Sequence, residues 1–190
     1  MSDQILIFLI DTIVGLFSLA LLLRFYFQLL RTPYYNQLSK FLIAITDFIV
    51  RPARRIIPGW AGMDLSTLIL AWLAQYIIVA SIFMLQGHNF GANIVGSAGV
   101  MGLLALVEIV KMTLYIVLVM IIVQAVLSWL NPNSPLAPLL DSFTRPFLGF
   151  FRKRIPPIAN VDLSPLFALI FIQLLLMIVA GAQMKIYTML

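Results

Sequence analysis

The chain has 190 residues, of which 63% are hydrophobic and only 10% are charged. A water-soluble domain of this length carries about a quarter charged residues, so the composition excludes a soluble fold. Cysteine is absent, which excludes disulfides, thiolate catalysis and cysteine-ligated metal or iron–sulfur sites. We therefore predict an all-α integral membrane protein.

The first apolar stretch follows only Met-Ser-Asp-Gln, without a positively charged region before it or a small-residue cleavage pattern after it. We expect this stretch to remain as a membrane helix and not to act as a signal peptide. Three more stretches are long enough to cross about 30 Å of hydrocarbon. The four predicted spans are residues 5–30, 65–85, 100–130 and 163–180.

A short amphipathic segment is predicted between each pair of spans, and we expect both segments to lie at the headgroup boundary. In the first, apolar residues recur at helical spacing at Leu38, Phe41, Leu42, Ile45 and Phe48, opposite Gln37, Lys40, Asp47 and Arg51. In the second, the apolar face holds Leu136, Leu139, Leu140, Phe143 and Phe147, opposite Asp141, Ser142 and Arg145. We expect Pro146 to end the second helix.

The net charge of +5 is concentrated in the two connections that hold these segments. Basic loops stay in the cytoplasm, so we predict that both connections are cytoplasmic and that both termini face outward. The charge is then explained by anionic lipid headgroups, and no nucleic-acid partner is expected. The basic residues concerned are Arg31, Lys40, Arg51, Arg54, Arg55, Arg145, Arg152, Lys153 and Arg154.

The chain repeats itself without gaps at a shift of 98 residues, with 10 identities over the 30 positions from Thr46 to Gln75. We therefore predict two tandem units, residues 1–90 and 100–190, joined by an outer Gly-rich linker at 91–99. Because each unit has two crossings, the units should run parallel about an axis along the membrane normal. The identities pair Thr46 with Thr144, Arg54 with Arg152, Ile57-Pro58 with Ile155-Pro156, Ala61 with Ala159, Asp64-Leu65-Ser66 with Asp162-Leu163-Ser164, Leu68 with Leu166, and Gln75 with Gln173.

Both cores resemble the YggT family of bacterial membrane proteins. The resemblance rests on Thr46, Arg54-Arg55-Ile56-Ile57-Pro58 and Asp64-Leu65-Ser66, and on Thr144, Arg152-Lys153-Arg154-Ile155-Pro156 and Asp162-Leu163-Ser164-Pro165. It implies location in the bacterial inner membrane and a connection with osmotic stress, cation or potassium homeostasis and genes of the cell-division region. It also implies kinship with single-unit plastid factors for cytochrome b6 maturation and nucleoid organisation. The first unit departs at Thr67 and at Asp47-Phe48, where the second has Pro165 and Arg145-Pro146.

Two glutamines are expected near the bilayer midplane, since Gln75 and Gln173 each lie 11 residues beyond the aspartate of their unit, about 16 Å along a helix. They serve either as interhelical hydrogen bonds or as a polar waist passed by a cation or proton. Arg24 lies close enough to the inner interface that we expect it to snorkel to lipid phosphate.

Asp11, Glu108 and Lys111 fall near the outer interface. Two interpretations are open for them. Either they form a charged cluster that lines an outer vestibule, or Glu108 and Lys111, one turn apart, neutralise each other or snorkel into headgroups.

The Asp-Leu-Ser start signal predicts a structural clamp. Ser66 and Ser164 should cap the second and fourth spans, with Pro165 in the first turn, while Asp64 and Asp162 pair with Arg54 and Arg152. The alternative is recognition, in which Arg54, Arg55, Arg152, Lys153 and Arg154 contact lipid headgroups or a partner.

Nothing in the sequence predicts catalysis. His88 stands without neighbouring ligands, and phosphate-loop, Gly-x-Ser-x-Gly and His-Glu-x-x-His motifs are absent. We expect no cofactor and a non-enzymatic scaffold or assembly factor that binds anionic lipid and a membrane partner or a second copy. The alternative is a component of cation transport or osmotic homeostasis.

Overall fold

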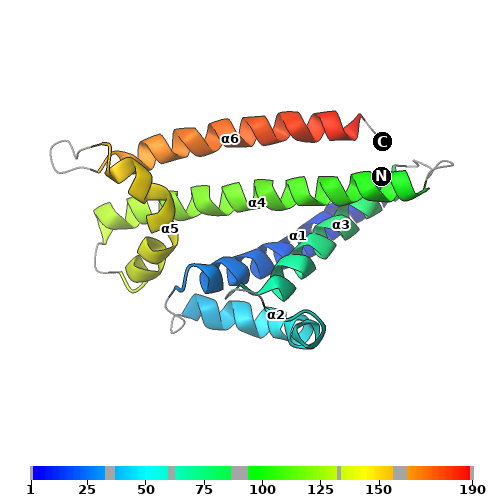
Figure 1. The fold of residues 1–190 in the computed structure, drawn as a ribbon, viewed down its shortest axis with the longest axis horizontal. Coiled ribbons are helices and arrows are strands. Elements are labelled where there is room, and N and C mark those ends of the chain that lie inside the picture. The colour runs from blue at the N-terminus through cyan, green and yellow to red at the C-terminus, as the bar shows by residue number, and fades with distance from the viewer. Residues whose placement is uncertain are drawn as a thin grey trace.

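The computed structural model describes residues 2–32, 37–59, 63–86, 94–131, 134–155 and 162–188. This part of the chain forms six α-helices, in agreement with the predicted all-α class (Figure 1). They are α1 (Ser2–Leu29), α2 (Gln37–Ile56), α3 (Leu65–Leu85), α4 (Ile94–Leu130), α5 (Ala137–Arg152) and α6 (Ser164–Tyr187).

Four of these helices, α1, α3, α4 and α6, are long and apolar enough to cross a membrane, which supports a multi-pass membrane protein. The second span matches its predicted bounds, and α6 continues seven residues past residue 180. α4 begins at Ile94 and not at residue 100, so most of the predicted linker is helical. Glycine is well tolerated in membrane helices, which explains why Gly96 and Gly99 do not delay the start.

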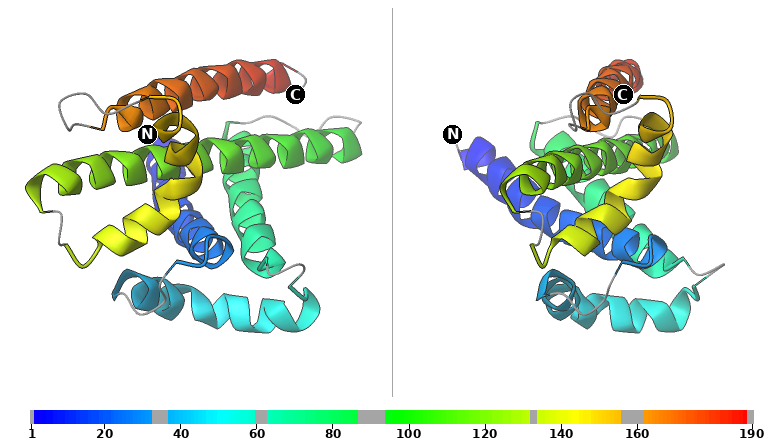
Figure 2. Two further views of the ribbon diagram at one scale, coloured as in Figure 1. Left: turned by 60° about the vertical axis from the view of Figure 1, so that its left-hand side comes forward. Right: turned by 90° about the vertical axis from the view of Figure 1, so that its left-hand side faces the viewer.

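The two shorter helices, α2 and α5, occupy the two predicted segments between spans. The expectation that Pro146 ends the second one is wrong, because α5 continues through it to Arg152. Likewise, α2 continues through Pro52. A proline inside a helix removes one backbone hydrogen bond and bends the axis without necessarily ending the helix, and both helices bend along their length (Figure 2).

The end of α1 is sharply defined. Arg31 adopts a positive φ of 50°, the left-handed conformation usual just past a helix end. The amide of Thr32 donates to the carbonyl of Phe27, and the amide of Arg31 donates to that of Gln28. This pair of hydrogen bonds is the Schellman motif, which satisfies the last carbonyls of α1 and turns the chain toward α2.

Each pair of spanning helices packs within its own unit. α1 packs most extensively against α3, and α4 against α6, while α2 and α5 each contact both spans of their unit. The two pairs meet mainly through α3 and α4, where the Trp72 indole donates to the Gly102 carbonyl over 3.1 Å. The two pairs cross obliquely (Figure 2).

One apolar cluster contains buried residues from all six helices. At its centre, the fully buried Phe143 of α5 makes edge contacts with Tyr26 and Phe27 of α1, at centroid distances of 6.2 and 6.1 Å. The short helix of the second unit therefore packs against the first span of the first unit. The two units share one core and are not independent bodies.

The two ends of the molecule differ. In Figure 1 both termini, the end of α3 and the start of α4 lie toward the right, and α2 and α5 lie below and to the left of them. Figure 2 shows that the two termini are apart from each other. We refer to the end that carries α2 and α5 as the basic end.

This arrangement predicts a labelling pattern. In a chain that has no native cysteine, single cysteines at Gln4 and Thr188 should react with a membrane-impermeant maleimide from the same side of sealed vesicles. A cysteine at Lys153 should react only from the other side. Reaction of all three from one side would contradict the four-span arrangement.

Candidate functional site

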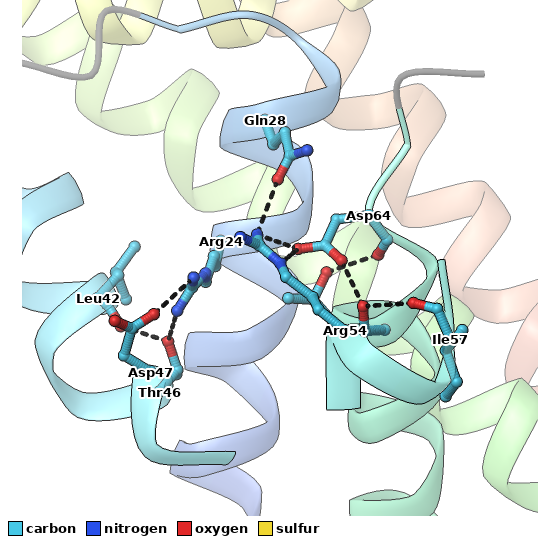
Figure 3. A network of polar contacts seen from close by, with 10 residues as sticks. Arg24, Gln28, Leu42, Thr46, Asp47, Arg54, Ile57 and Asp64 are labelled. Carbon is cyan, nitrogen blue, oxygen red and sulfur yellow. Dashed lines mark hydrogen bonds and ion pairs between the residues drawn. The ribbon is translucent and has the colours of Figure 1, made fainter. Parts of the chain in front are cut away.

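The basic end of the first unit is organised by an ion pair between Arg54 and Asp64 (Figure 3). Arg54 stands in the last turn of α2, and Asp64 directly precedes α3. The Arg54 Nε donates to Asp64 Oδ2 over 3.1 Å, and its Nη2 also reaches Gln28 of α1 at 3.4 Å. The Asp64 side chain is only 3% exposed. Arg54 thus connects three helices through one guanidinium.

Two hydroxyls complete this site. The Ser66 Oγ lies 2.7 Å from Asp64 Oδ1 and 3.3 Å from the Ile57 carbonyl oxygen. The Thr67 hydroxyl donates to the backbone carbonyl of Asp64. Burial raises the pKa of Asp64 and is the largest single effect. The hydrogen bonds from Arg54 and Ser66, with the charge of Arg54, outweigh it, so the pKa lies below its ordinary value. Asp64 is therefore held as a carboxylate.

The second unit forms the matching ion pair in a more open setting. Arg152 Nε donates to Asp162 Oδ2 over 2.9 Å, but the Asp162 side chain is 41% exposed. The Arg152 Nη1 also lies 3.7 Å from Asp141 of α5. Burial raises the pKa of Asp162, but hydrogen bonds from Ser164 and Arg152 outweigh it and leave the pKa lowered.

The predicted serine caps are wrong. The residue that caps α3 is Asp64 and the one that caps α6 is Leu163, and neither makes a side-chain cap hydrogen bond. Asp162 instead accepts the backbone N–H of Ser164, which is the first residue of α6, with Pro165 beside it in the first turn. The carboxylate accepts this N–H because it is the stronger, charged acceptor.

Arg24 forms a second polar site, which connects α1 to α2 (Figure 3). Its Nη1 donates to Thr46 Oγ1 over 2.8 Å, and its Nη2 pairs with Asp47 Oδ1 at 2.9 Å. Arg24 is 8% exposed, so the expectation that it snorkels to lipid is wrong. Asp47 also pairs with the exposed Arg51, and the hydrogen bond from Arg24 is the main reason that the pKa of Asp47 is lowered.

The equivalent threonine of the second unit also joins two helices. Thr144 of α5 is fully buried and hydrogen-bonds to Gln124 of α4. Thr46 and Thr144 each also donate to the carbonyl four residues earlier. Both units therefore use this hydroxyl to attach the short helix to the preceding span. Its partner on that span is the Arg24 guanidinium in the first unit and the Gln124 amide in the second.

The structure does not bring the two midplane glutamines together. Gln75 is buried, and its amide donates to Ser18 of α1 over 3.2 Å. Gln173 is exposed on α6. The first glutamine thus joins two helices of one unit, whereas the second faces outward.

At the other end of the bundle, the Lys111 Nζ lies 3.4 Å from Glu108. Gln183 of α6 donates to Glu108 over 2.7 Å and accepts from Lys111 over 3.4 Å. Asp11 is exposed on α1 and makes none of these contacts. The geometry corresponds to local neutralisation of Glu108, with a glutamine that was not predicted.

Basic side chains without an acidic partner gather at the basic end. Within the described residues, the acids there are all paired, namely Asp47, Asp64, Asp141 and Asp162. Arg145 is held by Asp141 at 2.6 Å. Among the described residues, the exposed cations Arg31, Lys40, Arg55, Lys153 and Arg154 form no ion pair, although Arg154 stacks 3.8 Å above the Phe150 ring.

Hollows of two kinds lie near these cations. An apolar cavity of about 380 Å³ lies among α4, α5 and α6, with Phe150, Phe151 and Ala168 in its wall. A more polar cavity of about 440 Å³ lies between the end of α4 and the start of α6, and Gln124, Trp129, Arg152 and Asp162 line it. The ion pair of the second unit is therefore in the wall of a cavity, whereas that of the first is packed among helices.

Sequence reasoning missed Arg24, Asp47, Gln124 and Gln183 as structural polar residues. The available signal was the pairing of Thr46 with Thr144, which marked the position where α2 and α5 meet a neighbouring span.

His88 lies outside the described residues. Within the described ranges, no group of three or more His, Cys, Asp or Glu side chains could hold a metal ion.

The shared role of Asp47 provides a matched pair of variants. Asp47→Asn should destabilise the protein by about 3 kcal/mol, because it leaves the buried Arg24 guanidinium without its counterion. Arg51→Gln removes the exposed partner and should cost no more than about 0.5 kcal/mol. Reversible unfolding in mixed micelles measures both values, and equal losses would contradict the assigned role of Arg24.

The lowered pKa of Asp64 predicts a pH dependence. The folded protein keeps this carboxylate charged below the ordinary pKa of 3.8, so its stabilising effect is complete above that pH and is lost as pH falls through the folded-state pKa. Asp64→Asn should lower Tm at pH 7. The difference in Tm from the unchanged protein should shrink below about pH 4. A constant difference down to pH 3 would argue against this ion pair.

Comparison with known proteins agrees with this two-unit architecture. The CCB3/YggT family matches residues 3–85 and 103–183, one match for each unit. An uncharacterized protein of Pseudomonas aeruginosa is 36% identical over 91% of this chain and 87% of its own length. The uncharacterized protein YggT of Escherichia coli K12 is 28% identical over 92% of this chain and 89% of its own. No solved structure matches. The chain belongs to the CCB3/YggT family.

Proposed function

We propose that this protein is a non-enzymatic membrane scaffold whose basic end binds anionic lipid headgroups and holds a partner in the membrane. The basic end then faces the cytoplasm and both termini face outward, as the positive-inside rule predicts. We infer that the chain lies in the inner membrane of a bacterium, which is what the resemblance to the YggT family implies. The two units act as parallel repeats on this surface.

The surplus of unpaired cations carries the proposal. At the basic end the described acids are neutralised by Arg24, Arg51, Arg54, Arg145 and Arg152, which leaves Arg31, Lys40, Arg55, Lys153 and Arg154 available. A basic side chain near an anionic membrane surface contributes about 1 kcal/mol of attraction. A cation that is already paired with an acid of the fold is not free to bind lipid, so we assign lipid binding to these five residues.

The short helices support an interfacial position. Phe41 and Phe48 of α2 and Phe150 of α5 are more than half exposed. Apolar side chains among cations suit the boundary between headgroups and acyl chains. Phe150 has two roles, since it lies in the wall of the apolar cavity and carries the Arg154 guanidinium on its ring. An acyl chain in the cavity would therefore have its headgroup beside Arg154 and Lys153.

The two units are assigned different tasks. The first is closed by the pairing of Arg54 with the buried Asp64 and by Arg24, so it serves as a rigid base. The second presents the exposed Asp162 and the cavity walled by Trp129 and Arg152, whose volume falls within the usual range for binding pockets. We assign partner contact to the second unit.

The alternative of cation transport has weaker support. It requires a polar path past both glutamines, yet Gln75 donates to Ser18 inside the first unit and Gln173 faces outward. A role in osmotic or potassium homeostasis stays a prediction from family resemblance.

Removal of the free cations tests the proposal. The double variant Lys153→Gln/Arg154→Gln should weaken binding of short-chain phosphatidylglycerol by about 2 kcal/mol, or roughly 30-fold. Neutral phosphatidylcholine should bind the variant as it binds the original chain. Native mass spectrometry and titration in neutral detergent measure both lipids.

The matched control is Arg145→Gln. Arg145 is an exposed arginine of α5, the helix that Lys153 and Arg154 directly follow, but it is already paired with Asp141. Arg145→Gln should reduce phosphatidylglycerol binding less than twofold. The substitution removes an arginine that is paired with Asp141 and leaves the unpaired cations that bind lipid in place. Equal loss in the control and the double variant would indicate a nonspecific charge effect. Retention of full binding by the double variant would overturn the proposal.

A further inference from the structure

The two repeat-related glutamines differ in a way that points to a missing partner. Gln75 is buried against the hydroxyl of Ser18 on the first span of its unit. The residue 98 positions after Ser18 is the buried Ile116, which has no polar group to offer. The second unit therefore has no counterpart of the Gln75–Ser18 hydrogen bond, and Gln173 lies on the outer surface of α6.

The depth of Gln173 makes this exposure costly. It stands nine residues after Ser164, the first residue of α6, which is about 14 Å along the helix. That distance is close to the middle of a hydrocarbon core about 30 Å thick. An amide offers two N–H donors and a carbonyl acceptor, and acyl chains can satisfy none of them. A polar partner in the membrane is needed.

Gln173 is part of a continuous stripe along α6. The residues follow one another at alternating spacings of four and three, and all are exposed: Leu166, Ile170, Gln173, Met177, Ala180 and Met184. The opposite side of α6 holds the buried Ala168 and Ile172, which pack into the shared core. Figures 1 and 2 show α6 at the edge of the molecule, so this stripe is accessible along its length.

Spacing of this kind is the heptad pattern of paired helices, in which each side chain of the stripe fits between four of the facing helix. Membrane helices commonly pair with the same geometry. A single polar residue in such a stripe sets the register of the pair. The stripe carries no charged residue, and Lys185 stands one position beyond it.

We propose that this face of α6 binds a second copy of the same chain, in a parallel pair with Gln173 opposite Gln173 of the second copy. Two copies inserted in the same orientation are related by a twofold axis along the membrane normal. When the two α6 helices pair along this axis, each stripe residue lies opposite the same residue of the second copy. The amide is complementary to itself, because the N–H of one copy donates to the carbonyl of the other. A second copy therefore satisfies both glutamines at once.

This dimer concerns the membrane-embedded surface and is separate from the lipid contact proposed for the basic end. Loss of one need not affect the other. The two proposals can therefore fail independently, since lipid titration measures the first and cross-linking measures the second.

Single-cysteine cross-linking tests the contact, and the cysteine-free chain permits it directly. Ile170→Cys and Met177→Cys, on the stripe, should form disulfide-linked dimers on oxidation in native membranes. Phe171→Cys and Ile178→Cys are equally exposed controls on a neighbouring stripe, and their yields should be at least fivefold lower. Equal yields at all four positions, or no dimer at any, would overturn the proposal.

The role of the amide is tested separately. Gln173→Leu should lower the dimer association constant roughly three- to tenfold, the effect expected for one or two interhelical hydrogen bonds in a membrane. Gln173→Asn should retain most of the association, because the amide is preserved. Energy transfer between labelled copies in vesicles measures both variants. Unchanged association of Gln173→Leu would overturn the pairing of the two glutamines.

Folding and competing occupants are controlled in the same series. Gln173→Leu should keep the Tm of the original monomer in detergent, since the Gln173 side chain forms no hydrogen bond with the described residues that the variant would break. If Gln173→Leu instead releases a different membrane protein while the cysteine variants give no linked dimer, the occupant of this face is that protein and the dimer is excluded.

Discussion

The ion pair between Arg54 and Asp64 determines how the first unit is built. An aspartate that is 3% exposed at the start of a membrane helix must have a counterion, and the last turn of α2 provides it. The same guanidinium reaches Gln28, so one side chain fixes the end of α1, the end of α2 and the start of α3 relative to each other. Arg24 then attaches the other half of α2 to α1 through Thr46 and Asp47. α2 is therefore held at its middle and at its C-terminal end by charges that the chain itself neutralises.

Duplication preserved this plan and then relaxed it. The second unit keeps the arginine, the aspartate and the threonine, but its threonine hydrogen-bonds to Gln124 where Thr46 accepts from the buried Arg24, and Asp162 is partly exposed where Asp64 is buried. The second unit consequently contains the polar cavity and the outward-facing Gln173. Divergence of this kind is expected when one copy maintains the fold and the other is free to acquire contacts. Phe143 keeps the two copies in one core by packing against α1.

Several features were predictable because they depend on local pattern. The length of the apolar stretches predicted the four spans, and helical spacing predicted α2 and α5. The 98-residue repeat predicted that Arg54 pairs with Asp64 and Arg152 with Asp162.

Three predictions failed for nonlocal or competitive reasons. Pro146 bends α5 without ending it, since packing of the helix on both sides of the proline outweighs one lost hydrogen bond. Ser66 does not cap α3, since its hydroxyl is directed to Asp64 and to the Ile57 carbonyl. Arg24 does not reach lipid, since Asp47 provides a fixed carboxylate within the fold.

The sequence by itself determined that the chain has four segments long and apolar enough to cross a membrane, in two related units, and that cations collect in the two connections between them. Those properties follow from hydropathy and from the order of residues, which no packing arrangement can change. Only the tertiary structure decided which polar groups are satisfied within the chain. Gln75 and Gln173 have the same residue type and the same position in the repeat, yet one is buried and the other exposed. The difference lies in a neighbouring helix, where Ser18 offers a hydroxyl and Ile116 does not, and a contact between helices is visible only once they are packed.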